Sequence, residues 1–386
     1  MTDQNSILDK IIESQERQQA AQFNPNDLVA NLFKNLSAKE SDILSRRFGL
    51  LGKEKETLEQ IGKYYDITRE RIRQIETATV KKLKDLKDFR RHVETAEQYI
   101  THLLENYGGI MEENFLLDEI NTTLSSDSSH HPASRFILNN LLNDKVESIK
   151  SGQELLNGWK LPVVSLDLIK EAIGELVNII NDENKLLKTE ELLDIFRKKD
   201  FFKNRKEQIA SLRLGVGDNE LDEEIDKIIN SYLKISKDAN QNILGEWGLG
   251  KWNTVYPKRM SDKIYLVLRK TGKPLHFTEI TDLINQVGFD KKVAYPATIH
   301  NELILDDRYV LVGRGIYALK EWGYEPGTVI DIIIEVLKKA EEPLTKEEIV
   351  KAVLDQRIVR KSTIYLALTN KEKIKKLPDG KYAINQ

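Results

Sequence analysis

The sequence predicts a mainly α-helical fold with small β wings, made of several small domains in tandem. At 386 residues the chain is long enough for more than one hydrophobic core. Capping-box patterns of the S/T-x-x-E/Q form stand before short segments whose apolar residues have helical spacing. A segment with a helix-and-hairpin pattern also occurs twice in the C-terminal half. Together these features indicate short helices, small hairpins and repeated domains.

Composition and hydropathy exclude several classes of protein. The chain contains no cysteine, which excludes disulfides and thiolate metal sites and fits a reducing compartment. The first residues, MTDQNSILDKIIESQERQQAAQ, lack the apolar core of a signal peptide. No apolar run approaches the roughly 20 residues that span a bilayer. We therefore expect a cytoplasmic protein with no membrane partner.

Positive charge is concentrated in two stretches of a chain whose formal net charge is −3. Residues 36–91 contain 15 Lys and Arg against 10 Asp and Glu, and residues 357–381 contain 8 against 2. The rest of the chain is correspondingly acidic. Two basic stretches on an acidic chain indicate two places where a polyanion can dock, although solvated surface helices are the alternative interpretation.

The first basic stretch predicts three successive helix starts. Ser37 begins the pattern SAKE and Thr57 begins TLEQ, and both patterns have capping-box form. In YYDIT, Asp66 suits the unusual backbone of a tight turn, and Thr68 can cap the next helix. Gly62 leaves room for two helices to cross closely. Helix, short turn and helix, with a small residue at the crossing, is the pattern of a helix-turn-helix.

On a helical wheel the third helix, TRERIRQIETATVKKLKDL, has an apolar side and a polar side. The apolar stripe, expected to face the core, consists of Ile72, Ile75, Thr79 and Leu83. The polar side near the helix start consists of Arg69, Glu70, Arg73, Gln74 and Thr77. Arg can donate to guanine O6 and N7, Gln can pair with adenine N6 and N7, and a recognition helix enters the major groove by its N-terminal end. Further positive charge toward the phosphates comes from Lys81, Lys82 and Lys84.

The segment LSAKESDILSRRFGLLGKEKETLEQIGKYYDITRERIRQIETATVKKLKDL resembles region four of the housekeeping sigma factors of bacterial RNA polymerase. The resemblance implies a helix-turn-helix that reads the −35 promoter element and rests on the polymerase flap. It implies that bases and backbone are contacted by Arg69, Glu70, Arg73 and Gln74, and that phosphate-side positions are held by Arg47 and Lys39. The expected DNA-contacting set is completed by Thr57, Thr77, Lys81 and Lys82.

Two features depart from the sigma-factor pattern. Ala78 stands where many sigma factors carry a lysine that meets upstream activators, so that contact is not expected. The helical domain that captures the melted −10 strand and grips the polymerase clamp is not recognised, since only 35 residues precede the match and they lack clustered tryptophans. We therefore do not expect this chain to open promoters alone.

The C-terminal half contains a duplication. DKIYLVLRKTGKPLHFTEI, from Asp262, aligns with DIIIEVLKKAEEPLTKEEI, from Asp331. Farther on, GIYAL, from Gly315, aligns with GKYAI, from Gly380. Each copy predicts a helix, a short turn, two helices and two strands joined by a glycine-bearing turn, which is the pattern of a winged helix. Strand alternation places the tyrosine of each G-x-Y-A motif on the core side of the wing.

The copy from residue 257 to 324 resembles the HARE winged helix, the domain found in the delta subunit of bacterial RNA polymerase. Fainter versions of the pattern lie upstream, in HPASRFILNNLL with LNGWKL and in KTEELLDIF with LGEWGL. The expected order is a polar helical segment, the sigma-like domain, two further winged helices, the HARE-type copy and a final winged helix. Their expected residues are 1–35, 36–93, 94–162, 163–252, 257–324 and 326–386.

The two C-terminal copies differ in charge at their third helix. In the HARE-like copy, YPATIHNELILDD offers Thr298, His300 and Asn301 but ends acidic, so DNA binding and a protein-binding or structural role are both compatible with it. In the final copy the helix start gathers Arg357, Arg360, Lys361, Ser362, Thr363 and Tyr365. The wing that follows carries Lys371, Lys373, Lys375, Lys376 and Lys381. We expect a phosphate-contacting surface here, with the main contacts made by Arg360, Lys361, Ser362, Lys373 and Lys375.

These patterns favour a sequence-specific transcription factor that reads −35-type double-stranded DNA and associates with RNA polymerase at its flap. A stand-alone repressor or nucleoid-type DNA-binding protein that ignores polymerase is the alternative. A partner-binding scaffold, without salt-sensitive DNA affinity, is a third interpretation. Since no metal-ligand spacing, phosphate loop or Ser-His-Asp pattern is complete, we expect no enzyme activity, cofactor, metal or small-molecule ligand.

Overall fold

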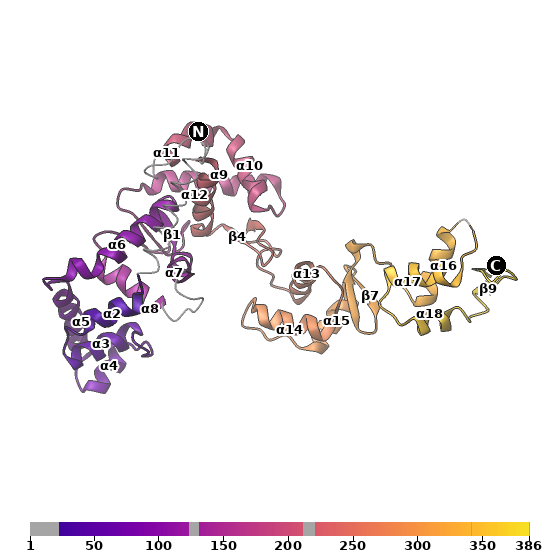
Figure 1. Ribbon diagram of the computed structural model, residues 1–386, viewed down its shortest axis with the longest axis horizontal. Coiled ribbons are helices and arrows are strands. Elements are labelled where there is room, and N and C mark those ends of the chain that lie inside the picture. Colours follow the sequence, from indigo (N-terminus) through magenta and orange to yellow (C-terminus); the bar gives the residue numbers. More distant parts are fainter. Residues whose placement is uncertain (1–22, 123–130, 211–220, 341, 386) are drawn as a thin grey trace, which may run out of the picture. The chain divides into compact units, whose positions relative to one another are not determined.

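The chain divides into two compact units, Met1–Asn240 and Gln241–Gln386 (Figure 1). Both consist of short helices with small antiparallel sheets, which confirms the mainly helical fold with β wings. No helix in the described residues is long and apolar enough to cross a bilayer. The computed structural model describes residues 23–122, 131–210, 221–340 and 342–385.

Four helices open the described part of unit 1, and three of them begin with the predicted caps. The helices are α2 (Pro25–Phe33), α3 (Ala38–Phe48), α4 (Leu58–Tyr65) and α5 (Arg69–Lys84). Ser37 and Thr57 each form a reciprocal capping box, in which a side-chain oxygen of Glu40 or Gln60 accepts from the cap N–H at 2.8 Å. Thr68 caps α5 by accepting from the N–H of Arg71 at 3.2 Å. These caps fix where α3, α4 and α5 begin.

Helix α2 lies in the predicted polar segment 1–35, of which residues 1–22 lie outside the described residues. Asn24 caps the helix with its side chain, and Pro25 occupies the first turn, where a missing N–H costs nothing. The helix buries apolar residues at helical spacing, namely Leu28, Val29 and Leu32. This part of the segment therefore belongs to the core of unit 1.

The turn between α4 and α5 has the geometry that the sequence predicts. Asp66 adopts a left-handed backbone with φ 52°, and a Cβ on Gly62 would lie 2.7 Å from the carbonyl oxygen of Ile67. Only glycine permits this close crossing. The apolar stripe of α5 is confirmed, because Ile75 is half-buried and three residues are buried: Ile72, Thr79 and Leu83. Ile72 packs with Ile43 of α3 and Ile61 of α4.

The next segment of unit 1 has a winged-helix-like order of elements. Its sheet has the order β1-β3-β2, so the last strand lies in the middle, with Trp159 of β3 opposite Met111 of β1 and Ser148 of β2. Trp159 is buried. The elements are α6 (Phe89–Asn106), β1 (Ile110–Glu112), α7 (Glu113–Thr122), α8 (His131–Phe136), the π-helix η2 (Ile137–Leu141), β2 (Glu147–Ile149) and β3 (Gly158–Lys160).

Of the helices that follow in unit 1, α12 (Leu221–Ile235) packs onto this sheet, and the others pack around α12. Ser231 of α12 donates a hydrogen bond to the carbonyl of Ile110 in β1, and the N–H of Leu156 donates to the carbonyl of Ile235 at 2.9 Å. The segments expected as separate winged helices at 94–162 and 163–252 thus share packing and backbone pairing. The elements concerned are α9 (Leu166–Glu183), α10 (Thr189–Lys198), α11 (Asp200–Ala210), α12 (Leu221–Ile235) and β4 (Ala239–Gln241).

Helix α8 and η2 pack against the α2–α5 helices. The ring of Phe136 lies 6.0 Å from that of Phe33 and 5.0 Å from that of Phe48, measured between ring centroids. Lys84 at the end of α5 donates to the side chain of Asn143. Phe136 is buried, so this third helix of the winged-helix-like segment is used for packing within unit 1.

The first repeat in unit 2 is also winged-helix-like. Its sheet has the order β6-β8-β7, with Tyr317 of β8 opposite Leu275 and Leu311. Tyr317 is buried in the core, as strand alternation predicts, and Gly315 makes the wing turn at φ 69°. The elements, with the preceding strand, are β5 (Trp247–Leu249), α13 (Met260–Thr271), β6 (Leu275–His276), α14 (Phe277–Val287), α15 (Pro296–Leu305), β7 (Tyr309–Gly313), β8 (Ile316–Leu319) and the 3-10 helix η3 (Lys320–Trp322).

The second repeat has the same order of elements. Strand β10 pairs with β9 and, on its other side, with Leu344, whose N–H and C=O both bond to Tyr382. Gly380 makes the turn between the two strands at φ 87°. The duplication read from the sequence is therefore a duplication of topology. Its elements are α16 (Val329–Lys339), α17 (Lys346–Gln356), α18 (Lys361–Ala367), β9 (Ile374–Lys376) and β10 (Tyr382–Ile384).

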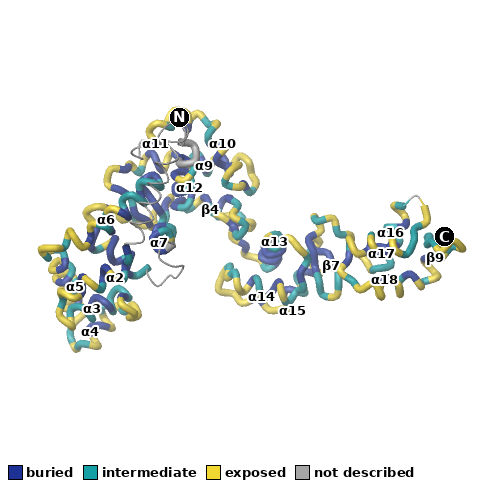
Figure 2. Tube along the Cα trace, viewed as in Figure 1, coloured by how far each residue is buried: buried dark blue, intermediate teal, exposed yellow. Residues whose placement is uncertain are grey.

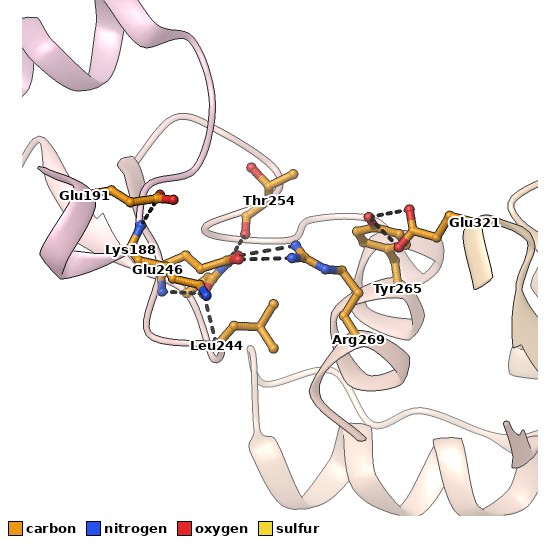
Figure 3. A network of polar contacts seen from close by, with 9 residues as sticks. Lys188, Glu191, Leu244, Glu246, Thr254, Tyr265, Arg269 and Glu321 are labelled. Atoms are coloured by element: carbon orange, nitrogen blue, oxygen red, sulfur yellow. Dashed lines mark hydrogen bonds and ion pairs between the residues drawn. The ribbon is translucent and has the colours of Figure 1, made fainter. Parts of the chain in front are cut away.

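An ion pair holds the segment before α13 to that helix. The guanidinium of Arg269 contacts both carboxylate oxygens of Glu246, at 3.0 and 3.3 Å (Figure 3). Glu246 also accepts from the side chain of Asn242 at 3.0 Å, and Asn242 donates to the carbonyl of Thr254. These contacts fix the entry into the first repeat of unit 2.

Candidate nucleic-acid interface

The N-terminal half of α5 presents the predicted polar side to solvent. Because Thr68 caps the helix, its first turn is ordered and its side chains project from a fixed backbone. Figure 2 shows many exposed residues along the α4 and α5 trace. All five predicted reading residues are exposed: Arg69, Glu70, Arg73, Gln74 and Thr77.

Glu70 and Arg73 form a two-point ion pair on this side of α5. The guanidinium donates through Nε to Oε2 at 2.9 Å and through Nη2 to Oε1 at 2.7 Å. This hydrogen bonding lowers the pKa of Glu70 and raises that of Arg73. The pair orients the planar guanidinium, and its remaining N–H groups are available for a base edge or a phosphate.

Arg71, which the sequence analysis did not select, also belongs to this surface. It is exposed, and its Nη1 donates to Oε1 of Gln74 at 3.1 Å. The contact uses the acceptor with which Gln74 would pair to adenine N6, so DNA must displace it for that readout. Its position three residues before Gln74 on the helix was the sequence signal for this contact. Thr77 donates its hydroxyl to the carbonyl of Arg73 at 3.0 Å.

Two of the predicted phosphate-side cations have carboxylate partners. Arg47 of α3 donates through Nε to Glu76 of α5 at 3.1 Å. Lys82 of α5 lies 2.9 Å from an oxygen of Glu40 in the α3 capping box. Both pairs connect α3 to α5, so these cations also hold the two helices together. The side chain of Lys82 is 47% exposed and that of Arg47 is 29% exposed, which leaves the lysine more accessible to a phosphate.

The other predicted backbone contacts are exposed. Lys39 lies with its ammonium 5.0 Å from the centroid of the Tyr65 ring. Lys81 is exposed in the last turn of α5. Thr57 is exposed at the start of α4, where its hydroxyl bonds to Gln60 at 2.8 Å. An exposed helix N-terminus and two exposed lysines are suited to contact with a phosphate backbone.

The capping box of α3 is electrostatically coupled to α5. The contact with Lys82, followed by the bonds from Ser37, lowers the pKa of Glu40 to about 2. Glu40 is therefore ionised at neutral pH. Glu40 and Lys82 offset each other's charge, so the pair adds little to the positive potential of the surface.

A partly buried polar network, not predicted from the sequence, supports the α3–α4 contact. Asp42 accepts from Nε of Arg46 and from the hydroxyl of Tyr65, both at 2.7 Å. Arg46 also contacts Glu56 at 2.8 Å. Burial, followed by the bond to Asp42, raises the pKa of Tyr65 to about 12. Of the adjacent Arg46 and Arg47, Arg46 thus stabilises the fold through this network.

The second predicted surface lies on the last repeat. Arg360, the N-cap residue of α18, is exposed, as are Lys361 and Ser362 in the first turn. Lys373 and Lys375, at β9, are exposed too. The structure thus places the five predicted contacts of this repeat on its surface.

Arg357 was expected among these surface cations, and this expectation is wrong. Its side chain is 3% exposed and donates to the backbone carbonyls of Leu311, Glu325 and Gly327. The distances to Glu325 and Gly327 are 2.6 and 2.8 Å. The N–H of Ile358 adds a bond to the carbonyl of Val312 at 2.8 Å. Arg357 anchors the last repeat to the outer strand of the preceding one.

The corresponding helix of the first repeat has a different surface. Helix α15 contains neither lysine nor arginine. Thr298 and Asn301 are exposed, but so are Ile304 and Leu305, at 62% and 81%. His300 is half-buried beside the ring of Phe277. The two repeats therefore share a topology and differ in surface chemistry.

The α3–α5 surface defines a helix-turn-helix DNA-binding domain: a capped second helix presents arginines and amides, with cations around it. A comparison with protein families agrees, because residues 32–85 match the family described as Sigma-70, region 4. Residues 32–85 are thus similar to a DNA-binding, non-enzymatic domain that acts in transcription.

Proposed function

We propose that the protein is a transcription factor that reads −35-type promoter DNA through α5 and associates with RNA polymerase. The observation that carries the proposal is the exposure of the reading residues on one capped helix within the family match. Arg73, oriented by Glu70, would donate to a guanine, and Gln74 would pair with an adenine.

The surrounding cations fit the role of positioning α5 on the duplex. Lys39, Lys81 and the start of α4 at Thr57 would contact phosphates on either side of the groove. Lys82 and Arg47 would contribute less, because each already contacts a carboxylate. Such contacts set register and affinity but do not discriminate between bases.

The partner that fits a sigma-type domain is the core RNA polymerase, at its flap. The expected domains at 94–162, 163–252, 257–324 and 326–386, with the HARE-type copy among them, would then extend the contacts to DNA or polymerase. The topology that two of these segments share in unit 2 supports this organisation.

Binding-site selection with the full chain tests the DNA-reading part. On the preferred site, Arg73→Ala or Gln74→Ala should cost about 1–3 kcal/mol and flatten the base preference at one position. Arg90→Ala, an exposed arginine of α6, is the control and should leave the preference intact. An unchanged preference in both reading variants would exclude direct readout by α5.

Affinity purification of the tagged chain from its native host tests the polymerase part. Polymerase subunits should be recovered, and should still be recovered after nuclease treatment. Recovery of DNA-dependent material alone would favour the alternative, a stand-alone repressor or nucleoid-type protein. Lack of any salt-sensitive DNA affinity would favour a partner-binding scaffold.

A further inference from the structure

We propose that the last repeat, residues 326–386, is a second DNA-binding site, which grips duplex phosphates without reading bases. Its contact surface is called the basic wing. The basic wing consists of Arg360, Lys361, Lys371, Lys373, Lys375 and Lys376, all of them exposed. It is separate from the α5 surface and does not depend on the function proposed for that surface.

The charge of the basic wing is largely uncompensated. Within the part of the chain that the structure describes, only Lys373 of the six reaches a carboxylate, that of Asp331 at 3.6 Å. That distance is longer than a charge-assisted hydrogen bond. Glu372 and Asp379 lie nearby in sequence but form no such pair with the six cations. The ammonium of Lys376 lies 5.9 Å from the centroid of the Tyr382 ring. A polyanion therefore meets cations of which most, in the described residues, have no carboxylate partner to give up.

Apart from Lys361, the lysines of the basic wing lie in β9 and in the turn before it. Ile374 of β9 is buried in the core of the repeat, and Lys375 follows it in the strand. Since successive side chains of a strand alternate, Lys375 lies on the outer face. Lys373 is exposed in the turn just before β9. Pairing of Lys375 with Ala383 in β10 fixes the position of β9.

Helix α18 offers no amide side chain to pair with adenine, because its seven residues, KSTIYLA, contain neither Asn nor Gln. Five of the six cations of the basic wing are lysines, and Arg360 is its one guanidinium. Beyond the first turn of α18, Tyr365 lies under the ammonium of Lys346, 3.5 Å from the ring centroid, and Leu366 is 73% exposed. Lysine ammoniums act on phosphates as point charges. The expected contact is therefore electrostatic, sequence-independent and strongly dependent on salt.

The first repeat shows that this charge is not a consequence of the fold. Its corresponding elements, α15 and β7, carry no lysine or arginine in PATIHNELIL and YVLVG. Arg357 is buried and is not part of the basic wing. It anchors the repeat by donating to three backbone carbonyls. The anchor joins the basic wing to a neighbouring sheet, which reduces the ordering that DNA binding must impose.

The test is a salt titration of the full chain on a duplex of random sequence. Replacing Lys371, Lys373, Lys375 and Lys376 with Gln should weaken binding by about tenfold or more and lower the slope of log affinity against log salt by about 2–3. The matched control removes four exposed lysines of the first repeat, Lys270, Lys273, Lys291 and Lys292. It should change neither quantity appreciably.

A second variant, Arg360→Gln with Lys361→Gln, probes the same surface from α18 and should lower the slope in the same direction. An unchanged slope in both wing variants would overturn the proposal, as would an equal loss in the control. A loss of affinity for only some DNA sequences would show that the basic wing reads bases, which contradicts the proposal. Arg73→Ala, measured alongside, should affect the preferred site only. A lack of any preferred site would therefore contradict the α5 proposal and leave this one standing.

Discussion

Arg73 and Glu70 form a two-point ion pair on the exposed side of α5, with donor–acceptor distances of 2.7 and 2.9 Å. The pair has two consequences for DNA binding. It fixes the plane of the guanidinium before DNA arrives, and it places a carboxylate on a surface that must approach phosphates. We therefore expect Glu70 to favour specificity at the expense of affinity for arbitrary sequences.

Glu70→Ala should raise affinity for random duplex DNA by about threefold to tenfold, because it removes a negative charge beside the backbone. Discrimination at the base that Arg73 reads should fall, because the guanidinium loses its orientation. Fluorescence anisotropy on preferred and random duplexes measures both effects. Glu183→Ala removes a surface carboxylate paired with Lys185 and serves as the control. Lower affinity for every sequence would contradict this role of Glu70.

Arg357→Ala should destabilise unit 2 by about 2–4 kcal/mol, because three carbonyls lose a buried charged donor. In denaturant, we expect the single unfolding transition of unit 2 to separate into two, because the two repeats no longer stabilise each other. Equilibrium unfolding followed by far-UV circular dichroism and tryptophan fluorescence checks this. Arg360→Ala, an exposed neighbour, should change stability by less than about 0.5 kcal/mol. Equal effects of the two substitutions would contradict the anchoring role.

Glu40 gives a pH-dependent contribution to stability. Its pKa is lowered from 4.5 to about 2, chiefly by the bond from Lys82, so the folded state favours the ionised form. The contribution is fully present above about pH 4.5 and is lost as the pH falls toward 2. At neutral pH, Glu40→Gln should cost about 1–2 kcal/mol, after allowance for solvent screening. The difference in unfolding free energy between the two proteins should shrink between pH 6 and pH 3. A constant difference would exclude the ion pair as its cause.

Gly62→Ala should destabilise the helix-turn-helix by about 1–3 kcal/mol, since the new methyl group would lie 2.7 Å from the carbonyl oxygen of Ile67. The matched control is Gly174→Ala in α9, where nothing lies within 4 Å of the added Cβ. That substitution should stabilise by about 0.5–1 kcal/mol through helix propensity. Thermal unfolding of both variants measures the contrast. A more stable Gly62→Ala variant would show that α4 and α5 can move apart at no cost in free energy.

The helix-turn-helix was predictable because its determinants are local. The capping boxes of Ser37 and Thr57, the turn at Asp66 and the stripe from Ile72 to Leu83 each depend on residues a few positions apart. The duplication in unit 2 was predictable for a similar reason, because both copies keep the same order of apolar segments and turn glycines. The roles of the individual DNA-contacting side chains stay predictions.

Partners distant in sequence were not predictable. Arg357 and Leu311 are 46 positions apart, and Lys82 and Glu40 are 42 apart. Nothing near Arg357 in the sequence distinguishes it from Arg360, which is exposed. In the same way, the sequence offered no signal that Phe136 would pack against Phe33 and Phe48. Only the assembled core decides which member of a charged stretch is enclosed.

The sequence by itself determined where the helices begin, where the chain turns, which side of α5 is polar and which repeat is basic. These features depend on hydrogen bonds and side-chain periodicity among residues that are close together in the sequence. The tertiary structure decided which cations face solvent. Burying an arginine requires acceptors in a suitable arrangement, and for Arg357 those acceptors are carbonyls of a different repeat.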